Sequence, residues 1–268
     1  MNNPHPADLF TTVVDTIPVD CIRPHDSDAT WVVYQHGRHH PHHILGVLRA
    51  RTHTDGHWYV QHTGEHHPTL ADAIRTLRRP TAWPHHRNQA ITWARRTLAD
   101  PSLLLIDIQT TGLHHPYALE IAVLHPNGHL LINETLNPQS PIDPHATALH
   151  GHTRHTTAHA PTFSDLLPRL TQALRHQHCL AYNTPFDHHV LHRELHRHYH
   201  HPAPTHTWLN TIRWSDALPP IATWTGRWSA RHHTYRYPPL TSHYNAAANC
   251  HTLLDKLHRL AQSDTRHN

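Results

Sequence analysis

Apolar residues in the second two thirds of the chain fall into runs that predict alternating strands and helices. The runs at 103–106, 117–124 and 129–136 predict three strands, and the turn at 126–128 is short enough for an antiparallel hairpin. These three strands should therefore form a meander. The remaining pattern predicts helices at 89–100, within 162–176, at 185–199 and at 245–262, with short strands at 178–182 and near 207–211. We expect an α/β domain with a mixed five-stranded sheet flanked by helices.

The first 80 residues predict a smaller unit. The segments 29–37, 42–52 and 56–64 are typical of short strands, and 69–79 is typical of a helix with Thr69 as its N-cap. We expect a small α+β (β-β-β-α) module over 1–80, an extended Pro-rich linker at 81–87 and the larger domain at 88–264. Two roles for the module stay open. It could be an accessory domain that stabilises the protein or docks a protein partner, or it could bind nucleic acid through Arg49, Arg51, Arg75, Arg78 and Arg79.

Composition limits the function only loosely. The formal net charge of +3 and the pI near 8.9 are compatible with nucleic acid as a partner. The three cysteines have neither metal nor redox spacing. We find no apolar run near the roughly 18 residues of a membrane span and no export signal, so we expect no membrane association and a cytoplasmic location.

The 39 histidines invite a hypothesis of metal binding, but they are scattered along the whole chain. His and Pro are abundant while Gly, Asp and Glu are scarce. Codons for the abundant residues begin with C and codons for the scarce ones begin with G, so a nucleotide bias explains the pattern without selection for metal. A His-rich metal-binding protein remains the third of three hypotheses for the function.

Three segments carry chemistry. In LLLIDIQTTGL at 103–113, a buried strand delivers Asp107 to the edge of the sheet, where open α/β sheets bind their ligands. This segment resembles the first motif of the DEDD exonuclease superfamily, Asp-x-Glu-Thr-Thr-Gly-Leu, with Gln109 in place of the Glu. CLAYNTPFDHHVLHREL at 179–195 resembles the second motif and matches it at Asn183, Phe186 and Asp187.

The third segment departs furthest from that superfamily. YNAAANCHTLLDKLHRL at 244–260 resembles the third motif of the DnaQ-like branch, but Tyr244 stands in place of the His and Asn249 in place of the Asp. A shifted register would use His243, and His251 also lies nearby in sequence. PIDPHATALHGHT at 141–153 resembles the intervening His-Gly-x-Thr signature. The resemblance covers about 88–262 and implies an RNase H-like fold.

The resemblance also implies a reaction, the hydrolysis of the terminal phosphodiester at a nucleic-acid 3′ end with two divalent ions. It assigns metal binding to Asp107 and Asp187, with Mg²⁺ or Mn²⁺ as the cofactor, and it places Gln109, Tyr244 and Asn249 at the other catalytic positions. The site thereby drops from four carboxylates to two, and hard cations require anionic oxygens. The substrate-binding residues implied are Thr110, Thr111, Gly112 and Leu113 in the turn, with Leu113 wedged against a base, and Tyr182, Asn183 and Phe186 in the groove.

Two functions from different classes follow from this pattern. The first is a 3′–5′ exonuclease with an impaired metal site. The alternative is a non-catalytic pseudo-exonuclease that binds single-stranded 3′ ends of DNA or RNA. Glu120 is expected to pair with a basic group rather than to replace a lost ligand.

Overall fold

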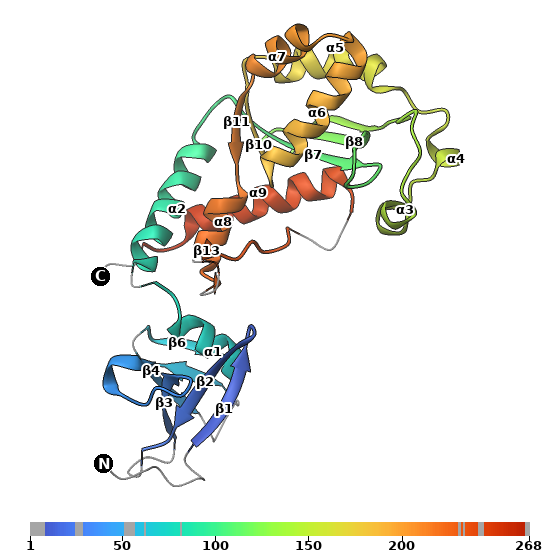
Figure 1. The fold of residues 1–268 in the computed structure, drawn as a ribbon. Helices are drawn as coiled ribbons and strands as arrows, with labels where there is room; N and C mark the ends of the chain where they lie inside the picture. Colours follow the sequence, from blue (N-terminus) through green and yellow to red (C-terminus); the bar gives the residue numbers. More distant parts are fainter. Residues whose placement is uncertain are drawn as a thin grey trace. The chain divides into compact units, whose positions relative to one another are not determined.

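The computed structural model describes residues 9–24, 29–50, 57–61, 63–80, 82–229, 232, 234–240 and 244–265. Two compact units are present (Figure 1). The first comprises 1–83 together with 226–236, and the second comprises 84–225 together with 237–268. The hairpin at 226–236 thus groups with the first unit, although the sequence suggested the second. Over the described residues, no helix is both long and apolar enough to cross a bilayer.

The first unit is richer in strands than expected. Six antiparallel strands pair in chain order, and one helix follows them. They are β1 (Leu9–Val14), β2 (Ile17–Ile22), β3 (Thr30–Gln35), β4 (Ile44–Ala50), β5 (Trp58–Val60), β6 (Glu65–His67) and α1 (Leu70–Leu77). The β-β-β-α prediction was therefore wrong, because it omitted β1, β2 and β6. β2 contains Pro18 and Asp20, residue types that are depleted in strands, and β6 reads Glu-His-His, which has no apolar residue. The N-cap prediction is confirmed, since the Thr69 hydroxyl accepts from Asp72 N at 3.1 Å.

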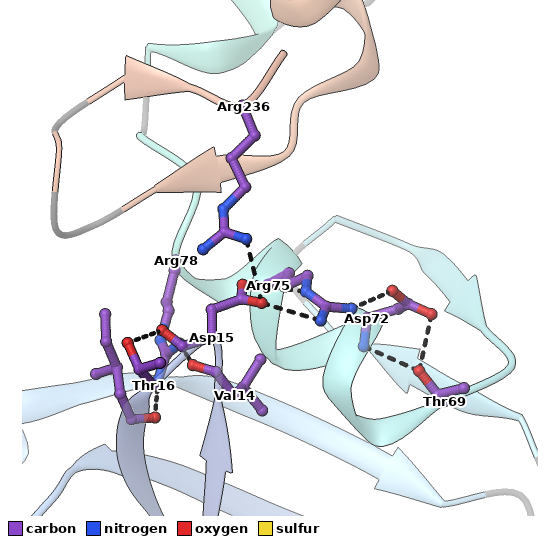
Figure 2. A network of polar contacts seen from close by, with 9 residues as sticks. Val14, Asp15, Thr16, Thr69, Asp72, Arg75, Arg78 and Arg236 are labelled. Carbon is purple, nitrogen blue, oxygen red and sulfur yellow. Dashed lines mark hydrogen bonds and ion pairs between the residues drawn. The ribbon is translucent and has the colours of Figure 1, made fainter. Parts of the chain in front are cut away.

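Several arginines of this unit form ion pairs and hydrogen bonds with other residues of the same unit. Arg75 forms ion pairs with Asp15 and Asp72, as Figure 2 shows. Arg78 donates to the carbonyls of Val14 and Ile17, and Arg79 pairs with Glu65. Arg236, from the inserted hairpin, also reaches Asp15 (Figure 2).

Three of the five arginines suggested for nucleic-acid binding therefore stabilise the fold of the first unit. Arg49 is exposed, and Arg51 lies outside the described residues. The accessory role for this unit is the interpretation that the ion pairs favour.

The linker predicted at 81–87 is wrong from Trp83 onward. α2 (Trp83–Leu98) begins there, with Pro84 in its first turn. A proline is tolerated at that position because the first N–H groups of a helix have no intrahelical partner.

The second unit contains the expected mixed five-stranded sheet, with strand order β11-β10-β7-β8-β9. β7 (Leu103–Thr110), β8 (Ala118–Leu124) and β9 (Leu130–Thr135) form the antiparallel meander, while β10 (His178–Ala181) and β11 (Arg213–Asp216) run parallel to β7. This confirms the fold class. The strand predicted near 207–211 was wrong, because that segment lies in the helix α7 (Pro202–Asn210) and the strand follows it.

Helices cover both faces of this sheet (Figure 1). On one face pack α5 (Phe163–Leu174), α6 (Thr184–Tyr199) and α7. On the other pack α2, α8 (Leu218–Thr225) and α9 (Ala246–Gln262). Two short helices, α3 (Pro144–His150) and α4 (Arg154–Thr157), follow β9. The inserted hairpin of the first unit consists of β12 (Trp228–Ser229) and β13 (Thr234–Tyr235), and a short 3-10 helix, η2 (Pro41–His43), precedes β4.

The alternation of side chains along β7 decides where the polar groups point. Leu104, Ile106 and Ile108 lie in the core beside α5 and α6, whereas Leu103 and Leu105 lie in the core beside α9. Since successive strand residues face opposite sides, Asp107 and Gln109 continue the α9 side. The strand therefore aims both polar side chains at the N-terminal turns of α9.

Candidate active-site pocket

The residues singled out by the three motifs meet at one pocket of about 520 Å³. Its lining includes Asp107, Gln109, Thr110, Gly112, Leu113, Tyr182, Phe186, Asp187, Tyr244 and Asn249. They come from β7 and the turn after it, from β10 and the start of α6, and from the start of α9. The predicted convergence of Asp107 and Asp187 is confirmed.

The Asp107 carboxylate is held by two side-chain amides. Gln109 Nε2 donates to Asp107 Oδ2 at 2.7 Å, and Asn249 Nδ2 donates to the same oxygen at 3.1 Å. An ionised carboxylate accepts hydrogen bonds, so both amides turn their nitrogen toward it. The two residues that replace acidic ligands thus supply donors at the place where a cation would otherwise lie. Asn249 Oδ1 is buried and has no partner among the described residues.

Asp187 is fixed by the backbone of β7. β10 pairs with β7 only as far as Leu105, so the later N–H groups on that side of β7 need other acceptors. Asp187 lies in the first turn of α6 and accepts from Ile108 N at 3.1 Å. Only 4% of Asp187 is exposed.

Both carboxyl groups resist ionisation. Burial raises the pKa of Asp107 to about 6, against the opposing effect of the hydrogen bonds from Gln109 and Asn249. Burial, followed by the negative charge of Asp107, raises the pKa of Asp187 well above its usual value. At neutral pH the pocket floor therefore carries an electrostatic cost, which the two amide hydrogen bonds reduce and which protonation of either carboxyl group relieves further.

That cost gives a prediction for stability. A carboxyl group with a raised pKa binds its proton more tightly when folded, so its stabilising contribution is complete below about pH 4 and is lost as pH rises through the folded pKa. Asp187→Asn removes the charge and keeps an oxygen for Ile108 N. We expect the free energy of unfolding near pH 8 to rise by about 1 kcal/mol or more, since an unpaired buried charge is among the changes with large effects on stability.

Urea unfolding near pH 5 and near pH 8 measures this effect. Asp255→Asn, at an exposed position on α9, is the matched control and should change little. A lower stability of Asp187→Asn than of wild type near pH 8 would contradict the electrostatic account of the pocket.

Leu113 has the exposure expected of a residue that contacts a base. Its side chain is 79% exposed at the pocket, which is unusual for a large apolar residue. The Thr110 hydroxyl instead donates to the Gly112 carbonyl within the turn. The prediction for Thr111 was wrong, because Thr111 is not among the lining residues and its N–H donates to the Tyr117 carbonyl. Because this N–H already forms a hydrogen bond within the turn, it is not available to a ligand.

Of the three second-motif residues expected in the groove, Tyr182 and Phe186 line the pocket, and Asn183 does not. The Tyr182 hydroxyl donates to the Pro238 carbonyl, and burial raises the pKa of Tyr182 to about 12, so its ring rather than its hydroxyl is presented. Phe186 lines the pocket and also packs against the core. Asn183 was expected in the groove but is not among the lining residues. It is exposed at the start of α6 with a positive φ of 73°, and its N–H donates to Asp216.

The third motif supplies Tyr244 at the rim, where it is 44% exposed, and Asn249 at the floor. His243, the alternative to Tyr244, lies outside the described residues, and His251 is exposed and is not among the lining residues. The expectation for Glu120 is confirmed. It is 2.5 Å from His152 Nε2 and accepts from Ala246 N at the start of α9.

One wall of the pocket was not predicted. Asp143, His145, Ala146, Leu149 and His150 line it from α3 and the residue before it. The signal was present, because these residues lie within the His-Gly-x-Thr segment, but their spacing along a short helix gave no indication that they face the pocket.

The residues present do not fit the two divalent ions of the implied reaction. Only two carboxylates lie at the floor, and the two amides that could offer oxygens point their nitrogens at Asp107. In the part of the chain that is described, no group of three His, Cys, Asp or Glu side chains is placed to hold a metal ion.

Comparisons with known proteins find similarities in the larger unit. Residues 104–223 match the model of the Exonuclease family, of the RNase T type. The uncharacterized exonuclease CP81 of Escherichia phage 186 is 28% identical over 101 residues, which are 37% of this chain and 52% of the phage protein. The chain thus spans about half the length of that relative.

Two solved structures are similar to part of the chain at low identity. Exonuclease X in complex with 5′ overhanging duplex DNA is 22% identical with a TM-score of 0.41, over 61% of this chain and 95% of that chain. Escherichia coli exonuclease I in complex with a dA16 oligonucleotide is 16% identical with a TM-score of 0.45, over 59% of this chain and 42% of that chain. The family match ends at residue 223, before Tyr244 and Asn249. Residues 104–223, which contain Asp107, Gln109 and Asp187, are thus similar to the Exonuclease family.

Proposed function

We propose that this protein binds the 3′ end of a single-stranded nucleic acid in the Asp107 pocket without hydrolysing it at the rate of a two-metal exonuclease. The observation that carries this proposal is the pair of amide hydrogen bonds from Gln109 and Asn249 to one oxygen of Asp107. These donors compensate the carboxylate from within the protein, so the pocket does not depend on a cation for its structure.

The charge of the pocket supports the same function. A floor with four carboxylates would repel the phosphate of a bound strand unless cations lay between them. This floor has two, and both pKa values are raised, so part of the population carries a proton near pH 6. The rim meanwhile keeps the exposed apolar and aromatic side chains of Leu113 and Tyr244, which suit contacts with an unstacked base.

The second candidate is an exonuclease with a weakened metal site. Asn249 Oδ1 favours it, because a buried amide oxygen without a partner is a neutral ligand that a single cation could use. Release of nucleotides from a labelled strand, compared in Mg²⁺, Mn²⁺ and EDTA, separates the candidates. Metal-dependent release by wild type at the rate of an active relative would favour the enzyme.

Leu113→Ala tests the use of the pocket for a 3′ end. We expect it to weaken binding of a linear single strand by about tenfold, about 1.4 kcal/mol, because an apolar contact with the terminal base is lost. Fluorescence anisotropy with a linear strand and a circular strand of equal length measures this, and the circular strand, which has no end, should bind weakly to both proteins.

Leu131→Ala is the matched control, since Leu131 is a partly exposed leucine on β9 that does not line the pocket. It should bind as wild type does. Equal affinity of wild type for linear and circular strands would remove the case for recognition of an end.

A further inference from the structure

A second hollow, which we call the α6 groove, lies along the helix that carries Asp187. It has a volume of about 520 Å³ and is lined by Tyr117 and by side chains of α6 and its C-cap. The α6 residues are all basic or titratable, namely His189, His192, Arg193, His196, Arg197 and His200. No acidic side chain is among the described residues that line it.

The two arginines of the groove are held in place. Both guanidinium groups stack on the Tyr117 ring, with the Arg193 and Arg197 Cζ atoms 4.8 Å and 4.2 Å from its centroid. Arg193 Nε also donates to the Pro116 carbonyl, and Arg197 pairs with the buried Glu194. A fixed guanidinium loses little rotational freedom when it binds an anion, so these two side chains form a prepared surface for phosphate groups.

The same two segments of the chain line the α6 groove and the Asp107 pocket. The segment after β7 provides Leu113 and His114 to the pocket and Tyr117 to the groove. His115, between them, lies with its Nδ1 3.3 Å from Arg193 Nη1. On the other wall, α6 provides Phe186 and Asp187 to the pocket and the basic residues to the groove. From Asp187 to His200 the helix rises about 20 Å, which is room for several nucleotides.

We infer that the α6 groove binds the phosphates of the nucleic-acid strand upstream of the 3′ end held in the pocket, and that its histidines make this contact stronger as pH falls. This inference rests on the proposed function, because it assigns the path of the same strand. Arg193 and Arg197 supply charge at every pH. His192, His196 and His200 supply further positive charge whenever their imidazoles bind a proton.

The groups around these histidines are themselves mostly cationic. His192 faces His196 on α6 at 6.3 Å between ring centroids and His206 of α7 at 5.4 Å. His188, His189, Arg193 and Arg197 of α6 and His115 of the preceding loop also lie nearby. The carboxylate of Glu194, on the same helix, is paired with Arg197. Partial burial and the neighbouring His206, His196 and His189 lower the pKa of His192. A bound phosphate favours its charged form, so binding of the strand and uptake of the proton should reinforce each other.

The test combines His192→Gln, His196→Gln and His200→Asn, the last because His200 has a φ of 53° that Asn tolerates. Fluorescence anisotropy is measured in EDTA near pH 5.5 and near pH 8 with a strand of about 12 nucleotides and one of about 3. For wild type we expect the longer strand to bind about tenfold more tightly near pH 5.5 and its salt dependence to steepen by about 0.7 for each phosphate newly neutralised. For the triple variant, the affinity for the longer strand should rise less than about threefold between pH 8 and pH 5.5.

A control variant with His129, His159 and His258 changed to Gln removes three exposed histidines away from the groove and should retain the wild-type gain. The shorter strand reports on the pocket alone and should bind the triple variant as it binds wild type. A triple variant that keeps the full gain with the longer strand overturns the inference about the groove while leaving the pocket intact. Failure of wild type to bind either strand overturns both proposals.

Discussion

Gln109→Glu combined with Asn249→Asp is expected to raise Mg²⁺-dependent release of nucleotides from a 3′ end by at least about 100-fold. The two substitutions return carboxylates to the positions that now donate to Asp107. They remove both amide hydrogen bonds and raise the number of acidic side chains at the pocket floor from two to four, beside Asp143 on the wall, and carboxylates are the donors that hard cations prefer. Loss of groups that merely orient metal ligands already costs about 10–100-fold in metal affinity or activity, so restoring two direct ligands should have a larger effect.

The measurement is release of nucleotides from a 5′-labelled single strand in Mg²⁺, with each single substitution tested separately. Asn210→Asp combined with Gln262→Glu adds the same two charges at exposed positions away from the pocket and serves as the control. It should behave as wild type does. Addition of Asp187→Asn to the restored variant should abolish the gain, because that substitution removes one of the four carboxylates again.

Two results would contradict this account. Wild type that cleaves as fast as the restored variant would show that the amides do not impair the site. A restored variant that binds Mg²⁺, as measured by calorimetry, and still releases no nucleotides would show that Tyr244 in place of a histidine is the decisive change. A phenol with a pKa near 10 is a poor base at neutral pH, so that second result has a physical explanation of its own.

The sequence was sufficient to predict the centre of the domain because strong patterns coincide there. The apolar run before Asp107 must be a buried strand, and Asp187 and Asn249 lie at helix starts that the patterns mark well. Both faces of β7 lie in the core, and one side of α6 and of α9 does. The apolar periodicity of the sequence therefore matches the burial in the structure. The five-stranded sheet and the meeting of the motif residues follow from them.

The edges of the fold could not be predicted in the same way. β11 (Arg213–Asp216) pairs with a single neighbour and has no apolar run, so the more apolar residues of α7 were taken for the strand. The Gln109 and Asn249 side chains point their nitrogens at Asp107 because of the way α9 packs on β7. Sequence patterns do not predict such side-chain orientations.

Binding without metal is the second large effect that we expect. Two fewer negative charges near a bound phosphate are worth about 1–3 kcal/mol at short range, which corresponds to about tenfold or more in affinity. Wild type should therefore hold a single-stranded 3′ end in EDTA about as tightly as in Mg²⁺. The Gln109→Glu, Asn249→Asp variant should bind at least about tenfold more weakly in EDTA and should recover its affinity when Mg²⁺ is added. Both affinities should fall with salt, because the strand releases counterions.

One measurement tests the central claim most directly. It is the affinity of wild type for a labelled single strand at low salt, determined by fluorescence anisotropy in EDTA and again in Mg²⁺. We predict dissociation constants that agree within about threefold between the two conditions, because the amides of Gln109 and Asn249 already compensate Asp107. Wild type that binds only when Mg²⁺ or Mn²⁺ is present would contradict the claim and would favour an exonuclease with a weak metal site.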